Sequence, residues 1–174
     1  MGAKKYGRNN RKTKSISNEI LIVCGGRTEQ IYFKKHKANL AKVKIIPCLN
    51  NESPLRIVES AIKENKKNKD KYIQVWCVFD KDDFIDFNEA IFKARKNNIR
   101  CAFSNESFEA WYLLHYKYFD NHKDRTKCIK ELEKEIGIEY DKVDEDIYDI
   151  LKDKMSKAIE NAKKAHQRYM AQGG

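Results

Sequence analysis

The stretch that decides the fold is ILIVCGGRTEQIYF, residues 20–33. Its first half is an apolar run rich in β-branched residues, which is typical of a buried strand. The run stops at Gly25 and Gly26, a polar turn follows, and Glu29 opens a segment with helical spacing. The glycines are adjacent and no Lys follows them in the P-loop pattern, so the turn is not a P-loop. The sequence predicts a strand, a tight turn and a helix, which is the repeating unit of an α/β sheet.

The same alternation continues along the chain. We expect strands at 19–24, 43–48, 72–79 and 99–103, and helices at 29–40, 54–65 and 84–96 between them. Such alternation predicts right-handed crossovers and an α/β, Rossmann-like fold with a mostly parallel sheet of about four strands. The first and third strands are nearly continuous apolar runs, so we expect them at the centre of the sheet.

The residues beyond the fourth strand have a helical pattern. We expect helices at 107–119 and 126–136, with Gly137 as a C-cap, and a last helix after the acidic segment 139–153. The predicted organisation is a basic, flexible N-terminal arm over 1–18, an α/β core over 19–120, and a helical extension of the same domain over 121–174.

The net charge of +10 is unevenly distributed. Residues 1–18 hold six basic side chains and no acidic one, residues 151–174 contribute +4, and the middle of the chain balances to zero. The N-terminal bases predict electrostatic contact with nucleic-acid phosphates, and a tail that only raises solubility is the alternative. The candidate nucleic-acid-binding residues are Lys4, Lys5, Arg8, Arg11, Lys12 and Lys14.

The cysteines indicate a reducing compartment. None of the five belongs to a CxxC pair, so the pattern does not predict a zinc site. Most of them lie in or beside apolar strand-like runs, as small buried residues of a cytoplasmic protein do. No apolar run is long enough to cross a bilayer, so we expect no membrane partner.

Acidic side chains follow the predicted strands at the edge where an open parallel sheet binds its ligands. Asp80 and Asp82 come after the third strand, and two carboxylates this close suit Mg²⁺ or Mn²⁺. The alternative is that they are turn and cap residues. Glu29 and Glu109 each begin a helical segment, where the helix dipole alone explains a carboxylate.

Four pieces of the sequence, taken in order, resemble the RloB-like family. They are ILIVCGGRTEQIYF, SPLRIVESA, VWCVFDKDDF and AFSNESFEAWYLLHY, and the resemblance runs from about residue 20 into the C-terminal helices. The family's fold is a variant of the Toprim domain of topoisomerases, primases and OLD-type nucleases. The resemblance implies that Asp80 and Asp82 are the metal-binding DxD. It also implies that Glu29, from a Thr-Glu motif, and Glu109, from Phe-Glu-x-Trp, belong to the catalytic site.

What the resemblance implies for function is a metal-dependent nuclease. Proteins of this kind are linked to bacterial antiphage loci, where they often lie beside an ATPase of the RloA or ABC type. The expected role is a toxic effector of abortive infection that the ATPase controls. The alternative is a non-catalytic subunit that docks on an ATPase or on nucleic acid. A primase-like nucleotidyl transferase ranks last, because the chain shows no separate nucleotide-selecting domain.

The chain departs from the family at the first motif. Family members commonly have Cys-Glu-Gly, whereas this chain has Cys24, Gly25 and Gly26, so the expected catalytic Glu is Gly25. Three explanations fit: a natural homologue with weakened catalysis, an engineered inactive variant, or a neighbour such as Glu29 or Glu109 that supplies the missing carboxylate.

Overall fold

The computed structural model describes residues 19–37, 42–48, 52–68 and 71–171. Four parallel strands form one sheet in the order β2-β1-β3-β4. They are β1 (Glu19–Cys24), β2 (Val43–Pro47), β3 (Tyr72–Asp80) and β4 (Arg100–Ser104). The predicted strands and the parallel sheet are confirmed to within a residue at most ends, and β1 and β3 are central as expected. Because the strands are parallel, all their carboxyl ends lie at one edge of the sheet.

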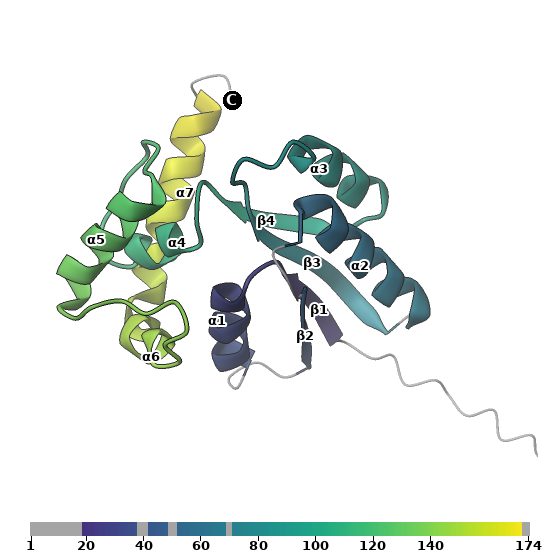
Figure 1. Cartoon of the computed structure of the whole chain (residues 1–174), viewed down its shortest axis with the longest axis horizontal. Coiled ribbons are helices and arrows are strands. Elements are labelled where there is room, and N and C mark those ends of the chain that lie inside the picture. Colours follow the sequence, from purple (N-terminus) through teal and green to yellow (C-terminus); the bar gives the residue numbers. More distant parts are fainter. Residues whose placement is uncertain (1–18, 38–41, 49–51, 69–70, 172–174) are drawn as a thin grey trace, which may run out of the picture.

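Helices cover both faces of this sheet (Figure 1). One face carries α2 (Pro54–Lys67) and α3 (Phe87–Lys96). The other carries α1 (Arg27–Lys37) and the C-terminal helices. The C-terminal helices are α4 (Glu109–Leu114), α5 (Arg125–Ile136), α6 (Ile147–Leu151) and α7 (Met155–Ala171), with a short 3₁₀ turn at Lys152–Lys154. Among the described residues, no helix is long and apolar enough to cross a membrane.

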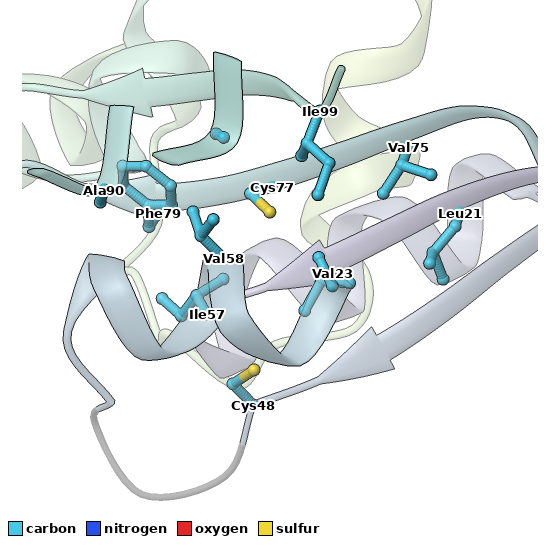
Figure 2. Close-up of a cluster of buried hydrophobic side chains, with 12 residues drawn as sticks. Leu21, Val23, Cys48, Ile57, Val58, Val75, Cys77, Phe79, Ala90 and Ile99 are labelled. Carbon is cyan, nitrogen blue, oxygen red and sulfur yellow. The ribbon is translucent and has the colours of Figure 1, made fainter. Parts of the chain in front are cut away.

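The face beneath α2 and α3, called the dry face below, is a core of buried hydrophobic side chains (Figure 2). Alternate residues of β1 and β3 point into it, as the two-residue period of a strand requires. Leu21, Val23 and Cys77 are fully buried there, and Val58 of α2 packs against them. Burial of such side chains gives roughly 25 cal/mol per Å² of apolar surface, so this face anchors the sheet.

The opposite face joins α1 to the C-terminal helices through an aromatic cluster. Tyr32 of α1 lies with its ring centroid 5.5 Å from that of Phe108 and 5.7 Å from that of Tyr112. Asn161 of α7 donates its side-chain N–H to the Leu114 carbonyl at 2.8 Å. The helical extension is therefore packed against the face of the sheet that carries α1.

The predicted helix 29–40 is α1 over Arg27–Lys37, with 38–40 outside the described residues, and two further predicted helices have different bounds in the structure. The predicted helix 84–96 begins at Phe87, because a turn in which the Phe87 N–H donates to the Phe84 carbonyl at 3.4 Å precedes it. The predicted helix 107–119 is limited to Glu109–Leu114. Beyond it, Lys117 and Lys123 both pair with Glu131 of α5 at 2.7 Å, so contacts between segments replace the helical path. Gly137 is the left-handed C-cap of α5, as predicted, with a φ of 76°.

Candidate functional site

A pocket of about 430 Å³ lies at the carboxyl edge of the sheet. It lies between the loop after β1, the loop after β3, the beginning of α4 and the beginning of α5. All five residues expected at the catalytic and metal sites border it; they are Gly25, Glu29, Asp80, Asp82 and Glu109. Residues more than 80 positions apart in the chain thus meet because parallel strands end at a common edge.

Asp80 and Asp82 reach the pocket by different local structures. Asp80 is the last residue of β3, whereas Asp82 lies in the following turn with a φ of 38°. Two residues apart in a strand would share a side because of the strand period, but here the turn brings them together. The Arg125 Nη2 atom lies 3.7 Å from Asp80 Oδ2 and 3.3 Å from Asp82 Oδ2. The two carboxylates therefore share one cationic partner.

The Asp80 carboxyl group has an unusual environment. Burial, followed by the nearby carboxylates of Glu29 and Glu109, raises the pKa of Asp80 to about 8, and Arg125 opposes this effect. Its Oδ1 atom is buried and has no hydrogen-bond partner within the described part of the chain. A buried acceptor without a donor is costly unless a ligand satisfies it.

Glu29 is 3% exposed and lies in the first turn of α1. Its burial raises the pKa to about 7, while hydrogen bonds from the backbone N–H groups of Glu29 and Gly26 oppose that rise and the Glu109 carboxylate adds to it. A glutamate that bonds to the N–H of the residue just before its helix supplies one half of a capping box, and Gly26 has no side chain to supply the other half. Glu29 is thus both a helix cap and a carboxyl group that changes protonation near neutral pH.

Glu109 is the first residue of α4 and is 2% exposed. Its Oε1 atom accepts a hydrogen bond from the hydroxyl of Tyr140 at 3.1 Å. Helix-dipole stabilisation explained this residue from sequence, but the structure adds a defined donor and two acidic neighbours, Glu29 and Asp80. Three acidic groups in mutual electrostatic contact are more than the dipole of a short helix requires.

Gly25 occupies the position where the family resemblance implies a catalytic Glu. Its backbone N–H donates to the Val78 carbonyl at 2.7 Å, two residues before Asp80 in the chain. An added Cβ atom would lie 2.8 Å from Ile57 Cδ1 and 3.2 Å from Phe79 Cβ. The first contact is with the end of a flexible side chain, so a side chain at position 25 requires Ile57 to move.

Arg125 and Tyr140 are site residues that the sequence did not reveal. Arg125 pairs with an aspartate 43 residues away, and Tyr140 with a glutamate 31 residues away. No local spacing relates such partners. The one usable signal was Asp124, which caps α5 by accepting a hydrogen bond from the Lys127 N–H at 2.9 Å and so puts Arg125 at the first helical position.

The residues present fit a site in which two carboxylates hold Mg²⁺. Mg²⁺ is usually bound by one or two carboxylates together with water and substrate phosphate, and the unpartnered Asp80 Oδ1 is such a donor. In the described ranges, no group of three or more His, Cys, Asp or Glu side chains is already arranged around a common point. The structure therefore fits Asp80 and Asp82 as ligands and does not fit a preassembled cage.

The predicted arm lies outside the described residues. Its six bases, Lys4, Lys5, Arg8, Arg11, Lys12 and Lys14, are in the range 1–18. Their expected contact with nucleic acid stays a prediction from composition. The five cysteines are all free thiols, four of them buried.

Comparison with known proteins gave one family. Searches of curated proteins and of solved structures returned no significant match. A family model described as RloB-like protein matches residues 20–173, which is most of the chain. The match covers both the sheet and the C-terminal helices that supply Glu109 and Arg125. The chain belongs to the RloB-like family.

Proposed function

We propose that the chain is a metal-dependent nuclease of the Toprim type. The observation that carries this proposal is the convergence of the acidic side chains Glu29, Asp80, Asp82 and Glu109 in one pocket, where Arg125 pairs with both aspartates. Proteins rarely bury like charges together unless a cation or a reaction uses them. A resemblance to Toprim domains supports the same reaction class.

Each residue has a role that its environment supports. Asp80 and Asp82 would hold Mg²⁺ or Mn²⁺. When bound, such an ion polarises a phosphoryl oxygen and lowers the pKa of water. Glu29 has a pKa near 7, so it can take a proton from an attacking water at neutral pH. Tyr140 fixes the Glu109 carboxylate at the pocket wall by its hydrogen bond.

The test is cleavage of DNA and of tRNA with Mg²⁺ or Mn²⁺, with and without an ATPase of the RloA or ABC type. Asp80→Asn should abolish any cleavage. Asp83→Asn is the matched control, because Asp83 lies in the same turn but does not line the pocket. Equal cleavage by wild type and Asp80→Asn would show that the nuclease activity, if present, does not use this pocket.

A second comparison tests the missing carboxylate. Gly25→Glu combined with Ile57→Val restores the acidic residue and removes the Cδ1 atom that its Cβ would contact. We expect this double variant to cleave faster than wild type, with Gly25→Gln and Ile57→Val as the uncharged control. If the double variant is inactive with both metals, both substrates and the ATPase, the nuclease proposal is wrong.

The cellular role we propose is that of a toxic effector in antiphage defence, controlled by the ATPase. The family resemblance supports this role. Co-expression with an ATPase of the RloA or ABC type should slow bacterial growth during phage infection, and Asp80→Asn should remove that effect.

A non-catalytic docking subunit is the second candidate. Gly25 in place of the expected Glu and the Arg125 pair that holds both aspartates favour it. Calorimetric titration separates the two candidates. A wild-type protein that binds no Mg²⁺ or Mn²⁺ even with nucleic acid present supports the subunit.

A further inference from the structure

Arg125 is the cationic side chain that touches both aspartates of the pocket. Its Nη2 atom is within 4 Å of both, at 3.3 Å from Asp82 Oδ2 and 3.7 Å from Asp80 Oδ2. The positive charge lowers the pKa of Asp80 and of Glu29, so it offsets the repulsion among the acids. Arg125 therefore does in the metal-free protein what a divalent cation would do.

The backbone of Arg125 is anchored by a hydrogen bond, and its side chain is partly exposed. The Arg125 N–H donates to Glu106 Oε2 at 3.1 Å, and Asp124 caps the helix one residue earlier. The Arg125 side chain is 38% exposed, and its Nε atom is buried with no hydrogen-bond partner in the part of the chain described here. Because its backbone is anchored, the Arg125 side chain can turn to a second acceptor without disturbing α5.

The guanidinium is also suited to phosphate. It carries five donors in a planar fork that matches two phosphate oxygens. It borders the same pocket as the proposed metal ligands, and Lys142 lines this pocket too. A guanidinium group at this place would contact the phosphate of any nucleic acid that reaches Asp80.

We propose that Arg125 holds the Asp80 and Asp82 carboxylates as a stand-in for the metal, and that it gives them up and binds a substrate phosphate when the metal is present. The phosphate half of this inference rests on the proposed function. The claim that Arg125 stands in for the metal does not need that function. It needs only a metal ion that competes with Arg125 for the Asp80 and Asp82 carboxylates.

The first experiment is calorimetric titration of Mn²⁺ into the full chain. Arg125→Ala should bind Mn²⁺ roughly three- to fivefold more tightly than wild type, which is the size expected for loss of a half-exposed ion pair. Lys127→Ala is the matched control: it removes the same charge from the same helix, but Lys127 pairs with Asp124 and does not line the pocket. Arg125→Lys keeps the charge and should bind Mn²⁺ as wild type does.

The second experiment is binding of a short fluorescent DNA duplex and of tRNA at several salt concentrations, with Mn²⁺ saturating. Arg125→Ala should lower the slope of log affinity against log salt by about one unit, as loss of one phosphate contact does, and Arg125→Lys should restore the slope. Lys127→Ala should leave it unchanged. If Arg125 has a purely structural role, Arg125→Ala should neither raise the Mn²⁺ affinity nor lower this slope by one unit.

The outcomes separate the two proposals. If wild type binds Mn²⁺ and Asp80→Asn does not, but Arg125→Ala binds no more tightly than Lys127→Ala, the stand-in is wrong and the metal site stands. An unchanged salt slope overturns the phosphate contact. If wild type, Arg125→Ala and Arg125→Gln all bind no Mn²⁺, the stand-in and the proposed nuclease both fail. Circular dichroism melts of each variant show whether α5 still folds.

Discussion

The face of the sheet beneath α2 and α3 and the carboxyl edge of the sheet both contain deeply buried side chains, but of opposite chemistry. Leu21 and Cys77 are 0% exposed on the dry face, and Glu29 and Glu109 are 3% and 2% exposed at the edge. Burial stabilises the first region and opposes ionisation in the second. The buried apolar side chains of the dry face therefore stabilise the fold. The buried carboxyl groups at the edge lower its stability when they ionise, unless a cation or substrate binds them.

The largest effect is expected on the dry face. Leu21→Ala should lower the free energy of unfolding by about 2–5 kcal/mol, because it removes buried methyl groups and leaves a cavity. Ile73→Ala is the control, since Ile73 lies in β3 and is 56% exposed. It should cost less than about 0.5–1 kcal/mol. Urea denaturation measures both, and equal losses would contradict the assignment of the core.

The next effect concerns pH. The pKa of Glu29 rises from 4.5 to about 7 and that of Asp80 from 3.8 to about 8 on folding. The folded protein therefore binds more protons between about pH 4 and 8, so the free energy of unfolding of the metal-free protein should fall as pH rises through that range. The full benefit is present below the unfolded-state values and is lost above the folded-state values.

Glu29→Gln sharpens this test. Gln keeps the capping-box hydrogen bond but has no charge, so it should flatten the decline and stabilise the protein at pH 8 by on the order of 2–3 kcal/mol. Thermal melts at pH 5 and pH 8 measure the change. Glu89→Gln, on exposed α3 surface, is the control. A steep rise in stability with pH would show that these carboxyl groups are ionised in the fold.

A smaller loss of stability is expected at Gly25, where the carboxyl edge meets the dry face. Gly25→Ala should cost about 1–2 kcal/mol because its Cβ would lie 2.8 Å from Ile57 Cδ1, which is overpacking. Ile57→Val removes that atom, so the double variant should lose less than the sum of the two single variants. Denaturation of the four proteins completes the cycle. Additive losses would show that the two positions do not touch.

The smallest effect is expected outside both regions. Lys93 of α3 pairs with Glu59 of α2 across the outer surface of the two helices, where both side chains are more than a third exposed. Glu59→Gln should change the free energy of unfolding by less than about 0.5 kcal/mol, and added salt should mask even that. Chemical denaturation in low and high salt tests it. A larger loss would mean that this pair helps to hold α2 and α3 together.

The sequence predicted the elements that have strong local signals. Runs such as VWCVF identify β3, and parallel strands then bring Asp80 to the same edge as Glu29 and Glu109. The short α4 was not predicted, because the aromatic pattern continues past Leu114 while Lys117 and Lys123 bind Glu131 instead. Arg125 was missed for a similar reason, since its partners lie in another part of the chain.

Gly26, the second glycine of the opening turn, leaves the space that the Glu29 carboxylate occupies. A Cβ atom at Gly26 would lie 2.5 Å from Glu29 Oε2, so a side chain at position 26 and the present place of this carboxylate exclude each other. The two neighbouring glycines thus have unlike tolerances: a side chain at position 25 requires Ile57 to move and Phe79 Cβ, 3.2 Å away, to yield slightly, whereas one at position 26 requires Glu29 to leave its cap. In a library randomised at both positions, substitutions at 26 should survive mainly with a changed residue at 29, and substitutions at 25 with a smaller one at 57.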